Sequence, residues 1–135
     1  MKNHDVQSVD LQVPRERAFA FIADPRQLPR WTSAFASVED GRARMRTPRG
    51  EVEVRLDVRS SAEQGTVDWL MTFPDGTLAT AFSRVVETDQ ERCVYSFVLM
   101  PPPVPLEELE GTLEAQSRTL AEELASLKRI VESHG

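Results

Sequence analysis

Residues 51–59 read EVEVRLDVR, so that valine or leucine alternates with a charged residue at every position. Successive side chains of a β-strand point to opposite faces of the sheet, so this alternation predicts a strand with one apolar face and one solvent-exposed face. A sheet with one exposed face is typically antiparallel. Its apolar face must then be covered by another element of the chain.

Similar alternating segments occur along most of the chain. Turn signals such as Asp40-Gly41 and Pro74-Asp75-Gly76 separate them. The last two segments carry apolar residues on both faces, so the pattern leaves their registers open. The alternation predicts six or seven antiparallel strands, over residues 4–13, 35–39, 42–47, 51–59, 66–73, 77–86 and 92–100.

Helical patterns lie on both sides of these strands. Residues 15–23 carry apolar side chains at helical spacing, and a second short helical turn is expected over residues 27–31. After the stiff connector at residues 101–105, residues 106–133 contain no proline and predict one helix roughly 40 Å long at about 1.5 Å per residue. Its apolar stripe consists of Leu109, Leu113, Leu120, Leu124, Leu127 and Val131.

The composition narrows the class of protein. The 135 residues fit a single domain, residues 1–135, and 16 basic against 22 acidic residues give a net charge of −6, which disfavours a nucleic-acid partner. Cys93 is alone and the two histidines lie near opposite ends, so we expect no disulfide, no metal site and no cofactor. No apolar run approaches the ~20 residues of a membrane span, and we expect a cytoplasmic location.

This order of elements predicts an α+β fold. It is a curved antiparallel sheet wrapped around the long C-terminal helix, with two short helices after the first strand. Since a curved sheet and a straight helix do not fit tightly everywhere, we expect an apolar cavity between them, with the short helices near its mouth.

Several segments resemble the START-like, or SRPBCC, superfamily. They are VPRERAFAFIADP (residues 13–25) and LPRW (28–31), then FSRVV (82–86), YSFVLMPP (95–102) and LASLK (124–128). The resemblance implies a helix-grip fold with a hydrophobic ligand cavity. Members of the superfamily include polyketide cyclase/dehydrase-like proteins, lipid and sterol carriers, quinone-binding proteins and activators of chaperones. They share no single catalytic motif, so the resemblance assigns no catalytic residue here.

Aromatic residues are the first candidates for the cavity. Trp31 follows the short helix, where it either lines the cavity mouth with an aromatic face and an N–H group or closes the end of the core. Trp69 lies beside Met71 on the apolar face of its strand, as cavity wall or as core. Tyr95 and Phe97 share a face. If that face points inward, the Tyr95 hydroxyl can donate to a ligand carbonyl, whereas an outward Tyr95 is a surface residue.

Polar residues have two interpretations each. Gln116 falls where the helical stripe should continue, so it is either a buried amide that needs a ligand or water partner or a solvent-exposed residue at the stripe edge, with Ser117 as the adjacent candidate. Arg84 is either buried against Asp68 or a ligand acid, or exposed on its strand. The predicted ligand-binding residues are Trp31, Val54, Leu56, Trp69, Met71, Phe82, Tyr95, Phe97, Leu113, Gln116 and Leu120.

The other charged residues are expected at the surface. Arg42, Arg44 and Arg46 form part of the exposed face of the sheet, and Glu122-Glu123 lies on the helix surface. Since no interior histidine is available, candidate catalytic bases are scarce.

We therefore expect a monomer or homodimer that binds a small apolar or aromatic molecule, of lipid-like or polyketide-like character. One alternative is a polyketide cyclase or dehydratase. A second alternative is a protein-interaction module with a filled interior and an exposed apolar patch.

Overall fold

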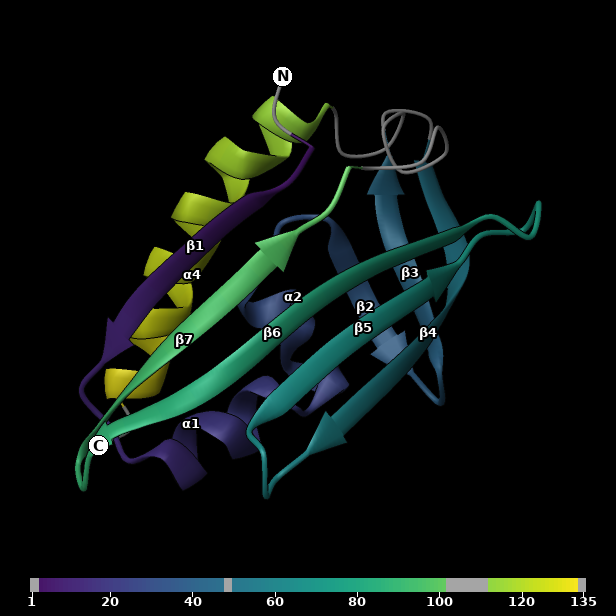
Figure 1. Cartoon of the computed structure of the whole chain (residues 1–135). Coiled ribbons are helices and arrows are strands. Elements are labelled where there is room, and N and C mark those ends of the chain that lie inside the picture. The colour runs from purple at the N-terminus through teal and green to yellow at the C-terminus, as the bar shows by residue number, and fades with distance from the viewer. Residues whose placement is uncertain (1–2, 48–49, 102–111, 134–135) are drawn as a thin grey trace.

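The computed structural model describes residues 3–47, 50–101 and 112–133. Its seven-stranded antiparallel sheet has the order β1-β7-β6-β5-β4-β3-β2, and the helices lie on one face of it (Figure 1). This architecture confirms the predicted helix-grip fold. The strands are β1 (Asp5–Leu11), β2 (Phe35–Glu39), β3 (Arg42–Thr47), β4 (Gly50–Ser61), β5 (Thr66–Thr72), β6 (Leu78–Asp89) and β7 (Arg92–Leu99).

Within the described residues, the helical elements follow the predicted order but not every predicted boundary. Two α-helices, α1 (Arg15–Ile22) and α2 (Leu28–Trp31), follow β1, with the 3₁₀ turn η1 (Pro25–Gln27) between them. The long C-terminal helix is α4 (Leu113–Ser133).

The expectation of an unbroken helix from residue 106 was wrong at Thr112. This residue is not helical, and its Oγ1 accepts a hydrogen bond from the Ala115 backbone N–H at 3.3 Å, which is the role of an N-cap. A threonine in that position is a start signal that the apolar stripe alone does not reveal. The rest of the expected connector and first helical turns, residues 102–111, lies outside the described residues.

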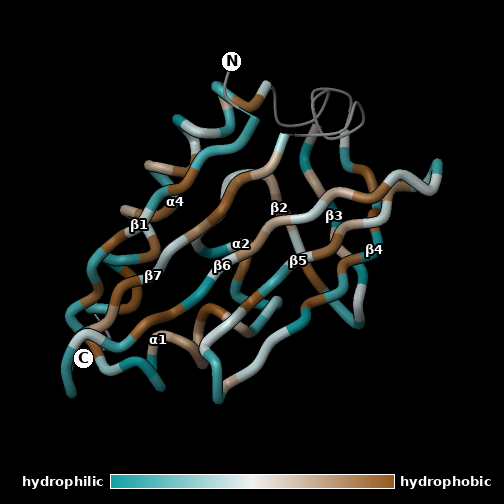
Figure 2. The backbone as a smooth tube through the Cα atoms, in the orientation of Figure 1, coloured by the Kyte–Doolittle hydropathy of each residue, from teal (hydrophilic) through white to brown (hydrophobic). Residues whose placement is uncertain are grey.

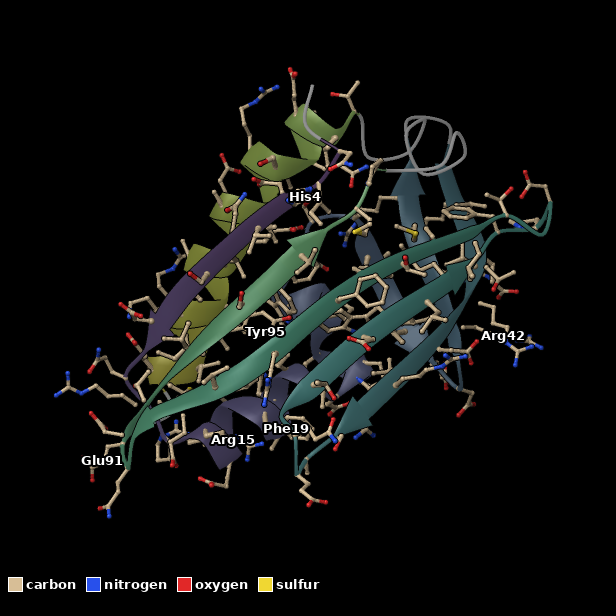
Figure 3. All side chains as sticks on the ribbon, in the orientation of Figure 1. His4, Arg15, Phe19, Arg42, Glu91 and Tyr95 are labelled. Atoms are coloured by element: carbon tan, nitrogen blue, oxygen red, sulfur yellow. The ribbon has the colours of Figure 1, made fainter. Side chains whose placement is uncertain are left out.

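The structure settles the two open registers. On β7, Cys93, Tyr95 and Phe97 are buried, whereas Phe82 and Val86 on β6 lie on the outer face. Hydrophobic and hydrophilic residues alternate along the strands in Figure 2, and Figure 3 shows Tyr95 among the interior side chains. The inward interpretation of Tyr95 and Phe97 is therefore confirmed.

Arg84 shares the outer face with Phe82. It is exposed, and its Nε donates to the Gln64 carbonyl at 3.0 Å, so the exposed interpretation of Arg84 is confirmed.

Helix α4 packs against the sheet edge formed by β1. Hydrogen bonds join the two elements along their length. Gln7 Nε2 donates to Ser117 O at 2.8 Å, and Lys128 Nζ donates to Asp10 O at 2.6 Å. Helix α1 packs on β6 and β7, and α2 packs against β2 and α4, with Trp31 reaching Trp69 on β5 and Tyr95 on β7. The buried stripe of α4 consists of Gln116, Leu120, Leu124, Leu127 and Val131.

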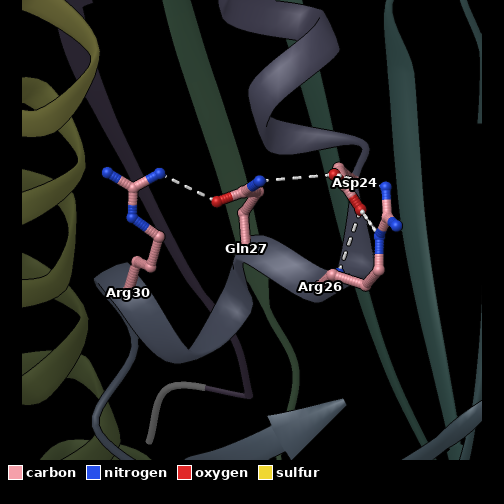
Figure 4. A network of polar contacts seen from close by, with 4 residues as sticks. All are labelled: Asp24, Arg26, Gln27 and Arg30. Carbon is pink, nitrogen blue, oxygen red and sulfur yellow. Dashed lines mark hydrogen bonds and ion pairs between the residues drawn. The ribbon is translucent and has the colours of Figure 1, made fainter. Parts of the chain in front are cut away.

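A polar network orients α2 relative to α1. Asp24 Oδ1 accepts hydrogen bonds from the Arg26 backbone N–H at 3.1 Å and from Arg26 Nε at 3.2 Å (Figure 4). Gln27 Nε2 donates to Asp24 Oδ2, and Arg30 donates to Gln27 Oε1 at 2.9 Å. Asp24 thus acts as the N-cap of η1 and fixes the turn that leads to Trp31.

Replacing Asp24 by alanine should lower the free energy of unfolding at pH 7 by about 1 kcal/mol, the usual cost of losing an N-cap side chain. Its hydrogen bond with Arg26 holds the pKa of the Asp24 carboxyl below its ordinary value. The stabilisation is therefore present above the ordinary pKa and is lost as the pH falls through the folded-state pKa. Urea titrations at pH 7 and in acid measure the difference. If Asp24→Ala lowered the free energy of unfolding equally at both pH values, the charge of the cap would not matter. Asp24→Asn is the control, because it keeps an N-cap side chain but has no charge.

Candidate ligand-binding cavity

A cavity of about 310 Å³ lies between the sheet, α2 and the first half of α4. Four aromatic rings, those of Trp31, Phe35, Trp69 and Phe97, form part of its wall. Its apolar lining is completed by Leu28, Ala34, Met71, Ala81, Leu99, Met100 and Leu120. Its polar lining consists of Thr32, Ser33, Arg46, Thr80, Gln116, Thr119 and Glu123.

The rings of Trp31, Trp69, Tyr95 and Phe97 form one connected aromatic cluster. Trp69 stacks on Phe97 with the ring centroids 5.7 Å apart and the planes at 26°. Trp31 meets Tyr95 edge-to-face at 6.3 Å and 84°, and it meets Trp69 at 6.4 Å. Such offset and edge-to-face pairs hold rings in fixed orientations, so this cluster is a rigid wall.

Three buried polar atoms of the cluster have no hydrogen-bond partner among the described residues. They are Nε1 of Trp31, Nε1 of Trp69 and the hydroxyl of Tyr95. Ser83 lies beside the Tyr95 hydroxyl; its own hydroxyl donates to the Val67 carbonyl at 2.5 Å, and its oxygen can still accept a hydrogen bond from Tyr95. Burial raises the pKa of Tyr95, so the phenol stays protonated. Unpaired buried donors are uncommon and weaken the fold, which points to a role other than stability.

The structure places six of the predicted site residues at the cavity wall: Trp31, Trp69, Met71, Phe97, Gln116 and Leu120. Trp31 and Trp69 both line the cavity, and both side chains are also almost fully buried in the core. Gln116 is 7% exposed, so of its two interpretations the buried one is confirmed. Its neighbour Ser117 instead bonds to Asp5 and Gln7 on β1.

The other predicted site residues lie elsewhere. Val54 and Leu56 on β4 are buried in the core and do not line the cavity. Tyr95 lies behind the wall, against Trp31 and Phe97. Leu113 is at the start of α4, outside the lining residues. The prediction that Phe82 lines the cavity was wrong. Its side chain is 41% exposed on the outer face of β6, because successive residues of a strand point to opposite faces and those of Ser83 and Val85 point inward.

Two charged residues at the cavity were expected at the surface. Glu123 lies three residues after Leu120 and seven after Gln116, a spacing that places it on the flank of the buried stripe. That spacing is the signal from which it could have been found. Arg46 reaches the cavity mouth from β3 and donates to the carbonyls of Ser33 at 3.1 Å and Phe35 at 3.3 Å.

Glu123 holds the segment between α2 and β2. Its Oε2 accepts hydrogen bonds from the Ser33 backbone N–H at 2.7 Å and from Ser33 Oγ at 3.1 Å. Burial raises the pKa of the Glu123 carboxyl, and the two hydrogen bonds from Ser33 offset only part of that effect. The charge of Glu122, the next residue, raises the pKa further. The cavity wall therefore includes one half-buried carboxyl group.

Two further findings concern metals and membranes. Within residues 3–47, 50–101 and 112–133, no three His, Cys, Asp or Glu side chains are grouped so that they could hold a metal ion. Across the same residues, no helix has the length and apolar character that crossing a membrane requires.

Solved structures share this architecture over almost the whole chain. A START superfamily protein from Mycobacterium smegmatis has a TM-score of 0.68 at 12% identity, covering 99% of this chain and 100% of that one. The Zhui aromatase/cyclase from Streptomyces sp. R1128 has a TM-score of 0.64 at 11% identity, covering 97% of this chain and 92% of that one.

The di-domain aromatase/cyclase BexL of the BE-7585A biosynthetic pathway has a TM-score of 0.68 at 15% identity, with 98% of this chain matching 47% of that one. No protein-family profile and no curated protein sequence matches this chain. At these identities the likeness concerns the fold alone. The chain has a START-like fold of the helix-grip type, as the sequence resemblance implied.

Proposed function

We propose that this chain binds a small, largely apolar aromatic molecule in the cavity between the sheet and α4. The observation that carries the proposal is a cavity of about 310 Å³ with four aromatic rings in its wall. Ligand pockets typically start near about 300 Å³, are mostly apolar and carry a few polar groups. The cavity meets each of these criteria.

The binding energy would come mainly from apolar surface that the ligand removes from water, at about 25 cal/mol per Å². Trp69 and Phe97 offer stacked faces for a planar ring, and Gln116 and Thr119 offer neutral polar contacts on α4. START-like neighbours that are aromatase/cyclases support a ligand of polyketide-like character, since their fold is shared. A lipid-like apolar molecule fits the same apolar lining.

Catalysis is the weaker hypothesis. A cyclase or dehydratase needs a general base or acid placed with a second group that positions or activates the substrate. Of the described residues that line the cavity, Glu123 and Arg46 carry charge, and both already bond to the segment that includes Ser33. This pair specifies no particular reaction, so we propose binding rather than turnover.

Adding 2-methoxynaphthalene, a neutral aromatic probe, should raise the midpoint of thermal unfolding in a concentration-dependent way. A ligand that binds only the folded state at a hundred times its Kd adds about 2.7 kcal/mol of stability. The chain has two tryptophans, both at the cavity, so both indole N–H signals in an NMR spectrum should move during the titration.

A matched pair of variants locates the site. Phe97→Leu removes a ring from the cavity wall and should weaken binding, whereas Phe82→Leu removes a ring from the outer face and should leave binding unchanged. Unmoved indole signals at saturating probe would contradict the proposal, and so would equal effects of the two variants.

A further inference from the structure

The Glu123 carboxylate has one oxygen that is bonded and one that is not. Oε2 accepts two hydrogen bonds from Ser33, and the structure shows none to Oε1 within residues 3–47, 50–101 and 112–133. The side chain lines the cavity, and Ser33 fixes its position. A carboxylate oxygen accepts hydrogen bonds and cannot donate them when ionised, so Oε1 offers the cavity a fixed acceptor.

The surroundings of Glu123 make this acceptor unusual. Apart from Arg46, the polar residues that share the cavity wall with it are neutral, among them Gln116 and Thr119 on the preceding turns of α4. No ion pair joins Arg46 to Glu123 in the described part of the chain, since Arg46 reaches two backbone carbonyls instead. Arg46 is exposed, so water screens its charge from a ligand inside the cavity.

Glu123 is also partly shielded from water. Burial raises the pKa of its carboxyl, so ionising the group in the folded chain costs more free energy than ionising it in water, and the two hydrogen bonds from Ser33 offset part of this cost. A carboxyl group with a raised pKa that lines a cavity is a typical candidate for a functional site. A neutral donor on a ligand would supply the second hydrogen bond that the carboxylate lacks, whereas an anionic group would add like-charge repulsion.

We propose that Glu123 selects ligands with a neutral hydrogen-bond donor, such as a phenolic hydroxyl, over ligands of the same shape with an acid group. The proposal rests on the proposed function, because it names the ligand class that the same cavity accepts. The ring system lies against Trp69 and Phe97, and the donor reaches Glu123 Oε1. The protein's net charge of −6 acts in the same direction, since it disfavours anions at every approach.

Three probes of one ring system test this selection: 2-naphthol, 2-methoxynaphthalene and 2-naphthoate. Calorimetric titration at pH 7 should give an affinity for 2-naphthol about tenfold above that for 2-methoxynaphthalene, the ratio expected for one hydrogen bond to a charged group. The affinity for 2-naphthoate should be the weakest of the three. In Glu123→Gln the preference for 2-naphthol should disappear and 2-naphthoate should bind more tightly, because the amide presents a donor where Oε1 was.

Glu122→Gln is the matched control. It removes the same charge from the neighbouring exposed position, which does not line the cavity, so the wild-type order of the probes should remain. If none of the probes binds, the proposed function itself fails. Two other outcomes would overturn the role of Glu123 while leaving the cavity as a binding site. One is that all three probes bind and 2-naphthoate binds most tightly; the other is that Glu123→Gln does not change the order of the three affinities.

Discussion

Replacing Gly65 by alanine should lower the free energy of unfolding by about 3 kcal/mol or more, a large effect for one methyl group. Gly65 has a φ of +77°, a conformation that costs residues with a Cβ about 1–2 kcal/mol. An added Cβ would also lie far inside van der Waals contact with the backbone oxygen of Val85. A backbone atom in a sheet cannot move aside as a flexible side chain can.

The turn that contains Gly65 is packed on two sides. Val85 N–H donates to the Gly65 carbonyl at 2.8 Å, which ties the turn to β6. Arg15 on α1 donates to the carbonyls of Ala62 at 2.7 Å and Glu63 at 3.0 Å. The β4–β5 turn therefore links the first helix to the middle of the sheet, and displacing it disturbs both.

Gly76→Ala is the control for Gly65→Ala, because it has the same unfavourable backbone conformation but no steric clash. Gly76 has a φ of +88°, but a Cβ there would meet no atom within 4 Å. Urea unfolding of the two variants should therefore show a much smaller loss for Gly76→Ala, about 1–2 kcal/mol. Equal losses would mean that the close approach of Gly65 to Val85 does not matter.

The strands could be predicted from the sequence wherever one face is charged. Residues 51–59 are the clearest case, since a one-residue slip would bury their charged side chains. On β6 and β7 both faces carry apolar residues, so the pattern could not decide whether Phe82 or Ser83 faces inward. In the structure Ser83 is buried, and its hydroxyl donates to the Val67 carbonyl on the neighbouring strand.

The existence of the cavity could be predicted, but its position could not. Alternation identified Val54 and Leu56 as inward residues, which they are, yet they pack in the core. Where the open space lies depends on which part of the sheet α4 covers. Hydrogen bonds such as Lys128 to Asp10 join α4 to β1 there, and no periodicity in the sequence reveals these partners. The spacing of Glu123 to Gln116 and Leu120 could have placed it beside the buried stripe, but the sequence does not show that Ser33 lies opposite it.

Replacing Trp31 by alanine should lower the free energy of unfolding by about 3–5 kcal/mol, a large share of the roughly 5–15 kcal/mol that stabilises a typical domain. Trp31 is 4% exposed, contacts Trp69 and Tyr95, and is the last residue of α2. The variant should also bind 2-methoxynaphthalene more weakly, since one wall of the cavity is removed. Urea unfolding measures the first effect and the indole signal of Trp69 the second.

Two further variants separate stability from binding in this test. Trp31→Phe keeps a ring and removes an N–H group that has no hydrogen-bond partner in the described chain, so its loss of stability should be well below that of alanine. Leu127→Ala empties a fully buried position on α4 that does not line the cavity, and should cost about 2–5 kcal/mol while leaving probe affinity unchanged in the folded protein. If Leu127→Ala weakened binding as much as Trp31→Ala, the loss would reflect a loosened fold, and Trp31 could not be assigned to the binding wall.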